Sequence, residues 1–471
     1  MRLGYNVKRL QDVVRSLFIK KKLASHDRWQ RGELFEFQRR QLSSLVKHAI
    51  SHSPFYRELY SHVDTRGDVL LNDLPIIDKA RMMENFDRFV TDPRLKLADL
   101  HAHIRQLTRD EYYLGEYRVL TTSGSSGMKG VFVSNRREWS TALACFFRCG
   151  EFMGLSPRFP IRWRIASIGG DSPIHVTYRM SVSADIGLHK TLRLQATSSI
   201  EDLVHSLSAF QPDVLVAYSS IAALLACEQL EGRLSIHPRV VSTTSEVRTE
   251  DMERKIREAW GGIPFNNYGM TEAGIVFGSD CSFHHGMHVF EDLFIVEVVD
   301  EHNRAVADGS PGHKLLITNL INNTQPLIRY EVSDMITLSQ ETCPCGRPMR
   351  LIAKMEGRSD DIIYLKSSND FDIPIHPIHF HSALGTFPEI KQYRIVQEED
   401  GIYIDVVPRG KPSAEKVGGM ISERVRGDVE AIGAICPDIH VKFIERMDRD
   451  PRLMGKLKLV KSNIRRQILK N

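Results

Sequence analysis

The sequence has no long apolar run, and this absence excludes a class of protein. No stretch of about 18 uncharged apolar residues occurs, so we expect no membrane span. The apolar pairs near the N-terminus, such as residues 17–18, are interrupted by charge, and no long apolar block of a signal peptide is present. We therefore expect a cytoplasmic protein.

The net charge is also small, and cysteines are few. The formal net charge is only +4, which is too small to indicate nucleic-acid binding. Seven cysteines are unevenly spread over 471 residues, a pattern that favours reduced thiols or metal ligands over a disulfide framework. With 42% hydrophobic and 26% charged residues, the chain has the composition of a globular protein with two or three domains.

The first forty residues are basic, and their apolar residues recur at a regular spacing. Leu10, Val13, Val14, Leu17 and Phe18 recur at helical spacing, so we expect an amphipathic helix. This helix could lie on a membrane surface or pack against the body with its basic face solvated, and we favour packing. A second helix is expected from residue 36 to a stop before residue 54.

Strand-like and helix-like segments alternate through the middle of the chain. Apolar runs at 161–168, 214–217 and 239–242 alternate with helical patterns at 199–210 and 221–230. This alternation predicts an α/β sheet with helices on its faces. Beyond residue 357, strands and a helix near 413–427 predict a compact α+β unit. We expect domains at 1–357, with a helical extension over 1–60, and at 358–471.

The stretch 117–134 is the strongest candidate for a binding loop. Two β-rich runs, 117–121 and 130–133, flank a centre of glycine, hydroxyl residues and one lysine. Such a loop could cradle a triphosphate, because glycine allows close backbone approach and lysine suits phosphate oxygens. A flexible turn with a solvated lysine is the alternative. The candidate ligands are Thr122, Ser123, Gly124, Ser125, Ser126, Gly127 and Lys129.

A helix is predicted directly after this loop. Residues 136–154 have a helical pattern, and Ser134 is the expected N-cap. Cys145 and Cys149 lie on one face of it, so we expect both in the core.

Two further motifs carry side chains suited to a nucleotide. In the run 266–272, Tyr268 could stack on a purine, Thr271 could donate to a phosphate, and Glu272 could hold Mg²⁺. Asp334 could accept hydrogen bonds from the vicinal hydroxyls of a ribose. The alternatives are a polar turn at a strand end and a strand-capping aspartate.

A glycine beside charged residues follows at 357–361, with the sequence GRSDD. Such a segment at a domain boundary suits a pivot, since a few residues there must absorb the dihedral change. An ordinary surface turn would have the same composition.

A cysteine–histidine set suggests a metal. Cys343 and Cys345 form a CPCGR turn, and Cys281 lies upstream beside three histidines in CSFHHGMH. Three sulfurs and one imidazole would make a closed, structural Zn²⁺ site. Unrelated buried thiols are the alternative.

Five motifs together resemble those of the adenylate-forming superfamily. The loop TTSGSSGMKG is similar to T-S-G-[ST]-T-G-x-P-K-G, with Met128 in place of proline. YGMTE resembles Y-G-x-T-E, and GRSDD resembles G-R-x-D-[DE]. RYEVSD is similar to Y-[RK]-x-G-D, from which Glu331 and Ser333 depart, and PRLMGKL is similar to P-R-T-x-x-G-K-I. The helix and FYR turn before residue 60 resemble the branch of phenylacetate-CoA ligases and coenzyme F390 synthetases.

This resemblance implies a fold and a role for each site residue. It implies a large N-terminal domain of layered β-sheets and helices and a small, mobile α+β C-terminal domain. Lys456 would be the mobile catalytic lysine, acting with Thr271 and Glu272, and Asp360 the hinge. The implied nucleotide ligands outside the loop are Ser245, Glu246, Asn267, Tyr268, Gly269, Thr271, Asp334 and Arg358. For zinc it points to Cys281, His288, Cys343 and Cys345, with His285 as second choice for the imidazole.

The implied function is an ATP- and Mg²⁺-dependent ligase. A small carboxylic acid would be converted to an acyl-adenylate with release of pyrophosphate, then transferred to the thiol of coenzyme A or of an acyl carrier protein's phosphopantetheine. We expect an aryl acid, bound near residues 218–220, 245–247 and 268–274. The alternatives are an amine or hydroxyl acceptor of acyl or AMP, and a non-catalytic nucleotide-binding protein. A homodimer is possible because dimers are common among relatives.

Overall fold

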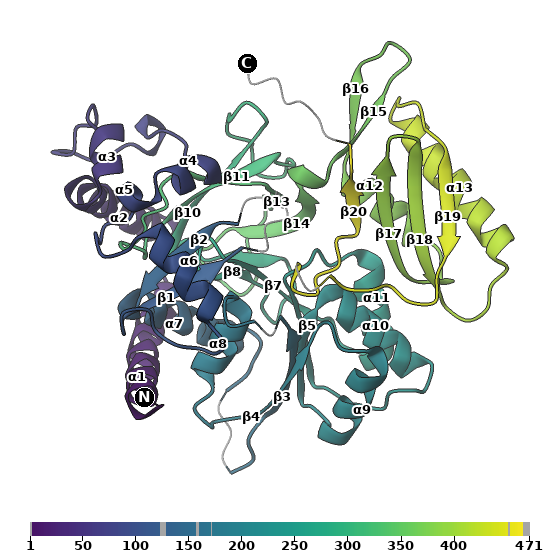
Figure 1. Ribbon diagram of the computed structural model, residues 1–471, viewed down its shortest axis with the longest axis horizontal. Coiled ribbons are helices and arrows are strands. Elements are labelled where there is room, and N and C mark those ends of the chain that lie inside the picture. The colour runs from purple at the N-terminus through teal and green to yellow at the C-terminus, as the bar shows by residue number, and fades with distance from the viewer. Residues whose placement is uncertain (1, 123–128, 157–159, 171, 451–452, 465–471) are drawn as a thin grey trace.

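A nine-stranded sheet forms the centre of the larger part of the molecule (Figure 1). The computed structural model describes residues 2–122, 129–156, 160–170, 172–450 and 453–464. The sheet order is β13-β14-β9-β8-β7-β6-β5-β3-β4. Its strands are β3 (Arg164–Gly169), β4 (Lys190–Gln195), β5 (Val214–Tyr218), β6 (Val240–Thr244), β7 (Phe265–Met270), β8 (Ile275–Ser279), β9 (Met287–Val289), β13 (Asp334–Leu338) and β14 (Leu351–Arg358).

The strands from β4 to β7 run parallel, and their connections are helical. These helices are α8 (Val176–Ala184), α9 (Ile200–Phe210), α10 (Ser219–Leu230) and α11 (Glu250–Trp260). Leu207, Leu225 and Ile256 from three of them pack with Leu215 and Ala217 in one apolar cluster on one face of the sheet. Because parallel strands all point the same way, their carboxyl ends lie together at one edge, where the site described below is built.

Two smaller sheets flank the central one. The antiparallel pair β1 (Tyr117–Thr121) and β2 (Val131–Asn135) carries the glycine-rich loop, as predicted. The second sheet contains β10 (Phe294–Val299), β11 (Lys314–Asn319) and β12 (Tyr330–Val332). Loop residues 123–128 lie outside the described residues.

The helix after β2 begins at Arg136, as predicted, but its cap is not the predicted residue. α7 (Arg136–Phe152) is capped by Asn135, whose side chain accepts hydrogen bonds from the backbone N–H groups of Arg137 and Glu138. Ser134 was the predicted cap, and this is wrong because the first helical residue is Arg136, so the capping position falls on Asn135. Cys145 and Cys149 are buried, as predicted.

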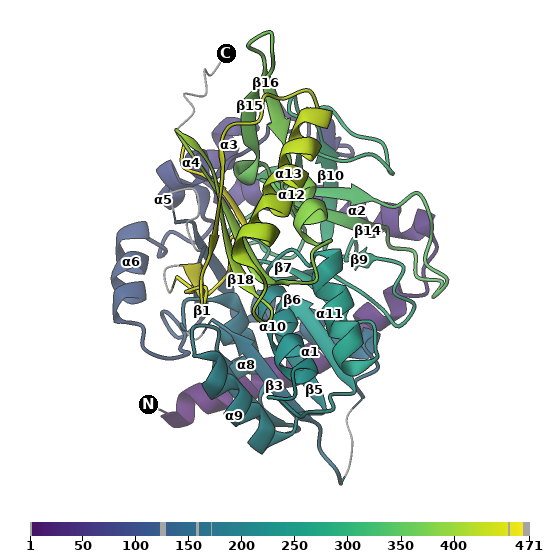
Figure 2. The same cartoon turned by 90° about the vertical axis from the view of Figure 1, so that its right-hand side faces the viewer.

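The N-terminal helices pack on the outside of this body, as Figures 1 and 2 show. They are α1 (Arg2–His26), α2 (Arg31–His52), α3 (Pro54–Leu59), α4 (Lys79–Glu84), α5 (Phe86–Phe89) and α6 (Leu97–Gln106), with a 3₁₀ turn η1 (Leu71–Asp73). Helix α1 packs along α7. None of the helices in the described ranges is long and apolar enough to cross a bilayer.

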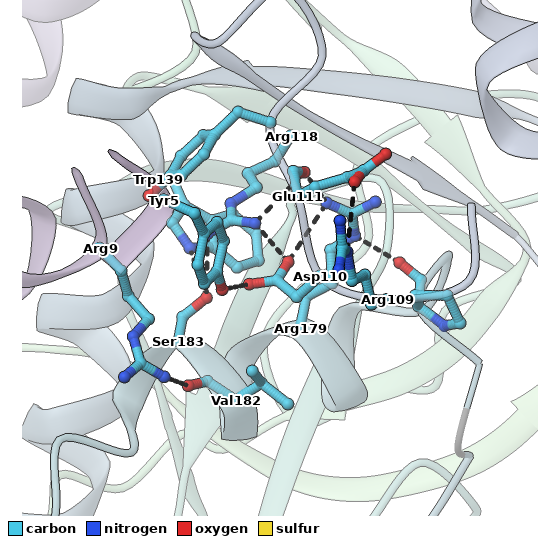
Figure 3. Close-up of polar contacts among 12 residues, drawn as sticks. Tyr5, Arg9, Arg109, Asp110, Glu111, Arg118, Trp139, Arg179, Val182 and Ser183 are labelled. Atoms are coloured by element: carbon cyan, nitrogen blue, oxygen red, sulfur yellow. Dashed lines mark hydrogen bonds and ion pairs between the residues drawn. The ribbon is translucent and has the colours of Figure 1, made fainter. Parts of the chain in front are cut away.

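The apolar face expected on α1 is largely not the face that packs. Val13 is buried, but Leu10, Val14, Leu17 and Phe18 remain exposed. Val13 and Leu23 join the apolar core of the larger part, and polar contacts with buried charges add to this packing. Among them, the hydroxyl of Tyr5 donates to Asp110, which also pairs with the fully buried Arg118 and Arg179 (Figure 3). Further along the helix, the guanidinium of Arg136 contacts Asp12, and His26 contacts Asp292 at 2.9 Å.

The last hundred residues form a second unit with its own core. Strands β17 (Ile390–Glu398), β18 (Gly401–Pro408), β19 (Ile439–Phe443) and β20 (Val460–Ser462) make a four-stranded sheet in the order β19-β18-β17-β20. The hairpin β15 (Ile363–Lys366) and β16 (Asp372–Ile375) and helices α12 (Pro377–Leu384) and α13 (Ala414–Ala431) complete it. The 3₁₀ turn η2 (Ser359–Asp361) links it to β14. The predicted fold class, α/β with a small α+β unit, is confirmed, while the 357/358 boundary and the unit's mobility stay predictions.

The Asp110 contacts predict a large effect of one conservative substitution. Asp110→Asn keeps the side-chain shape but leaves the buried guanidinium groups of Arg118 and Arg179 without a counter-charge. Breaking a buried ion pair on one side costs about 3–5 kcal/mol, so the denaturant-unfolding midpoint should fall markedly. As a control, Asp64→Asn removes the partner of the exposed Arg66 and should leave the midpoint unchanged. Equal midpoints for both variants would show that the Asp110 contacts do not hold the N-terminal region.

Candidate active site

A cavity of about 540 Å³ lies at the carboxyl ends of the parallel strands. It collects side chains from the residue that follows β1, from the ends of β5 to β7, from β13 and β14, and from the C-terminal segment. Most of the residues singled out from sequence line it, namely Thr122, Ser245, Glu246, Asn267, Tyr268, Gly269, Thr271, Glu272, Asp334, Arg358 and Lys456. Segments more than 300 residues apart in the sequence therefore meet at one site.

Three predicted groups are not placed in the cavity wall. Lys129 is exposed and does not line it. Asp360 lies in the turn η2 behind the wall. Ser123, Gly124, Ser125, Ser126 and Gly127 lie outside the described residues. Thr122 is buried, and its hydroxyl accepts a hydrogen bond from the backbone of Gly130 at 2.9 Å, which closes the base of the β1–β2 loop.

One wall is organised around Asp334 at the start of β13. Its carboxylate accepts a hydrogen bond from the hydroxyl of Tyr268 and lies 3.3 Å from the guanidinium of Arg358. Burial and the neighbouring Asp334 raise the pKa of Tyr268 well above its usual value, so this hydroxyl remains a donor. The pair presents a fixed carboxylate and guanidinium to any ligand in the cavity.

Ser333, a departure from the superfamily pattern, has a defined role in this wall. Its hydroxyl accepts hydrogen bonds from Arg358 at 2.6 and 3.0 Å and donates to Asp360 at 3.0 Å. The serine thus connects the cavity arginine to the proposed hinge residue, a link that glycine could not make. Next to it, Lys458 pairs with Asp361 at 2.5 Å.

The opposite wall is organised around Glu246, which follows β6. Its carboxylate accepts hydrogen bonds from the backbone N–H of Ser220 at 2.9 Å and of Leu457 at 2.6 Å. Its neighbour Ser245 has a positive φ of 69°, a left-handed conformation that turns the chain sharply after the strand. Glu246 thereby joins the C-terminal segment to the central sheet.

Arg449 makes the same connection a second time, and sequence analysis missed it. Its guanidinium donates to the hydroxyl of Ser220 at 2.7 Å and to the carbonyl of Gly455 at 2.8 Å, and lies 3.5 Å from Glu246. Burial lowers its pKa. In the sequence Arg449 is one of several basic residues before Lys456, so no local pattern distinguishes it from a solvated charge.

Lys456 is held in the cavity by these contacts. The backbone of Leu457 is bound to Glu246 and the carbonyl of Gly455 to Arg449, so the residues on both sides of the lysine are fixed. Burial lowers the pKa of Lys456 below its usual value, and so does the charge of Arg358, whereas the carboxylates of Glu246, Asp334 and Glu272 offset this only in part. The arrangement therefore places the lysine among three carboxylates and one guanidinium inside the protein.

His175 is a second cavity residue that sequence analysis missed. It precedes α8 and is buried against the Lys456 segment, and burial together with the charge of Lys456 lowers its pKa to about 4. A neutral imidazole therefore faces the cavity at pH 7. A lone histidine in an irregular segment carries no sequence signal for such a position.

The predicted metal ligands form a compact cluster away from the cavity. One ligand atom from each of Cys281, His288, Cys343 and Cys345 lies within 4.8 Å of all the others. The sulfurs of Cys281 and Cys343 are 3.6 Å apart, and the sulfur of Cys345 is 3.4 Å from Nε2 of His288. His285, the second choice, is outside the cluster.

The donor set fits zinc. Tetrahedral Zn²⁺ with Zn–S bonds of about 2.3 Å places its sulfurs roughly 3.8 Å apart, close to the distance found here. Burial and nearby arginines lower the pKa of His288 to about 4, so its imidazole is neutral and can act as a ligand.

Comparison with known proteins agrees with this geometry. No family model matches the chain. It is 26% identical to the phenylacetate-coenzyme A ligase of Thermus thermophilus over 79% of this chain and 80% of that protein. Identity to the Escherichia coli phenylacetate-coenzyme A ligase is 27%, over 72% and 74%.

The solved structures agree in fold. A 2-hydroxyisobutyryl-CoA ligase in its postadenylation state, bound to an adenylate, matches 93% of this chain and 91% of its own with a TM-score of 0.71 at 18% identity. The same ligase in an open conformation with adenylate and coenzyme A matches with a TM-score of 0.58. The chain is thus similar in sequence to phenylacetate-coenzyme A ligases and shares its fold with a 2-hydroxyisobutyryl-CoA ligase.

Proposed function

We propose that this protein is an AMP-forming acid–thiol ligase. It would activate a carboxylic acid with ATP and pass the acyl group to the thiol of coenzyme A or of a phosphopantetheine carrier. The observation that carries the proposal is the meeting of Lys456 with Glu272, Asp334 and Arg358 in one cavity. The acceptor and the aryl character expected of the acid stay predictions.

The first step forms a mixed anhydride. A carboxylate oxygen attacks the α-phosphorus of ATP, and the bond to the bridging oxygen of pyrophosphate breaks. Negative charge builds up between the two reacting groups, and the ammonium of Lys456 offsets it. Asp334 and Arg358 would hold the ribose, since a carboxylate accepts from its hydroxyls. Glu272 lines the cavity, and its carboxylate would hold Mg²⁺, which would neutralise phosphate charge.

In the second step a thiol attacks the acyl carbon and AMP leaves. Lys456 would have no part in this step, because the superfamily resemblance implies that it moves out of the cavity with the C-terminal unit between the steps. The superfamily resemblance implies that the C-terminal unit turns about residue 360 between the steps. The higher similarity to the postadenylation state than to the open one supports placing this structure in the adenylating arrangement.

The cysteine–histidine cluster is proposed to hold one structural Zn²⁺. The ligands would be Cys281, His288, Cys343 and Cys345. Such a site contributes folding free energy rather than catalysis, because all four positions are filled by protein.

Lys456→Ala separates the two half-reactions. We expect ATP–pyrophosphate exchange to fall by a factor of roughly 100 or more, since a charge-stabilising group is lost. Turnover of a pre-made acyl-adenylate with thiol should change less than about threefold. Lys461→Ala, on the exposed part of β20, is the matched control and should leave both rates unchanged. Equal losses in both half-reactions for Lys456→Ala would contradict the assigned role.

Arg449→Met tests whether the lysine must be positioned. Without the guanidinium, the carbonyl of Gly455 and the hydroxyl of Ser220 lose their shared donor, so Lys456 should spend less time in the cavity. We expect a 10–100-fold slower exchange and partial rescue in Arg449→Lys. Arg446→Met, at an exposed position three residues earlier, should behave as wild type. A change confined to the thiol step would exclude this positioning role.

Metal analysis tests the zinc site independently of activity. Purified protein should contain about one zinc per chain, and Cys343→Ser should lose it together with thermal stability, because folding and binding are coupled. Cys436→Ser, at a buried thiol outside the cluster, should retain the metal. Metal-free protein prepared without chelators, with unchanged stability, would remove the site.

A further inference from the structure

The cavity that holds Lys456 is longer than a nucleotide requires. It continues from Gly169 and Tyr218, at the carboxyl ends of β3 and β5, to Ile165 and Val214 near the amino ends of the same strands. We call this part, lined along the strands by Ile165, Ser167 and Val216 among others, the arm. Lys456 stands at its inner end.

Burial along β5 shows that the arm is an internal space. Leu215 and Ala217 are fully buried on the face toward α9 and α10, whereas Val216 on the other face is only partly buried. β5 is an inner strand, paired with β3 and β6 on its two sides. An inner strand beneath helices gains such exposure only from a cavity, so the apolar side chain of Val216 faces empty space.

Helices and loops complete the wall, and they are mostly apolar. Phe147 and Met153 come from α7 and its end, and Val176 and Met180 come from α8. The outer end reaches helix α1 at Leu17 and Lys20. Lys20 forms an ion pair of 2.6 Å with Glu151 there, and both side chains are partly exposed, at 23% and 42%. The arm therefore opens to solvent beside α1.

In place of the aryl acid expected from the sequence, we propose that the acid activated by this enzyme is a straight-chain fatty acid, with its carboxylate at Lys456 and its alkyl chain along the arm. The inference rests on the proposed ligase function and names its substrate class. A flat aryl acid would fill only the part next to Tyr218 and would leave the apolar wall beyond Ser167 without contacts.

The strands set the length of chain that fits. The four residue-to-residue steps of β5 from Tyr218 to Val214 span about 13 Å. An extended alkyl chain with C–C bonds of about 1.5 Å advances roughly 1.25 Å per carbon, so about ten carbons fill the arm. Val216 and Ser167, paired in the sheet, mark the halfway level at about five carbons.

Chain-length dependence of ATP–pyrophosphate exchange tests the proposal. With acids from acetate to tetradecanoate, kcat/KM should rise about fourfold per methylene up to about ten carbons and then level off. Benzoate and phenylacetate should be poorer than decanoate. A flat profile, or a preference for the aryl acids, would overturn the proposal.

Two substitutions test how far along the arm the alkyl chain reaches. Val216→Phe blocks the halfway level and should lower the decanoate-to-butyrate ratio of kcat/KM at least tenfold. Ile165→Phe, at the outer level, should affect tetradecanoate more than hexanoate. Ile161→Phe makes the same change at a residue that is 76% exposed and outside the cavity wall, and its profile should match wild type. Identical profiles for all three variants would also overturn the proposal.

Calorimetric binding of decanoate without nucleotide separates this inference from the ligase proposal. If no acid supports exchange but decanoate binds, and Val216→Phe weakens that binding at least tenfold, the arm is a fatty-acid site and the ligase proposal fails. If short or aryl acids are adenylated and decanoate neither binds nor reacts, the ligase stands and the arm assignment fails.

Discussion

One buried carboxylate ties the two parts of this molecule together. Glu246 accepts backbone hydrogen bonds from Ser220 of the central sheet region and from Leu457 of the C-terminal segment. A buried carboxylate is stable only when such donors or opposite charges surround it, and Arg449 and Lys456 supply the charge. The same contacts that satisfy Glu246 therefore place the lysine that the proposed chemistry needs.

This arrangement makes the site conditional on the position of the C-terminal unit. The contacts to Glu246 from residues 449–457 are few, and all of them are polar. Each of the two units, by contrast, has its own apolar core. An interface of this kind can separate without unfolding either unit. The proposed two-step reaction would use such a separable contact, because Lys456 is proposed to serve the first step only.

The sequence was sufficient for the fold class and for much of the cavity wall. Loop and strand motifs keep local spacing, so Tyr268, Asp334 and Arg358 could be named before their neighbours were known. Their partners could not be named. Ser333 departs from the glycine of the superfamily motif, yet its hydroxyl links Arg358 to Asp360. Arg449 has no distinctive local pattern, and only the folded chain brings it to Ser220.

Helix α1 shows a second limit of sequence patterns. The helical period was correct, but it does not say which face packs: Val13 and Leu23 are buried in the core, and polar contacts such as that of Tyr5 with Asp110 lie beside them. The apolar arm was equally hidden, because it arises where alternate residues of β3 and β5 face α7 and α8 across a gap.

The most direct test of the account is a crystal structure with a non-hydrolysable acyl-sulfamoyl adenosine. The account predicts that its ribose hydroxyls contact Asp334, that the Lys456 ammonium lies within hydrogen-bonding distance of the sulfamoyl–acyl junction, and that the acyl chain enters the arm. An inhibitor bound with its ribose away from Asp334, and with Lys456 out of reach of the junction, would contradict it.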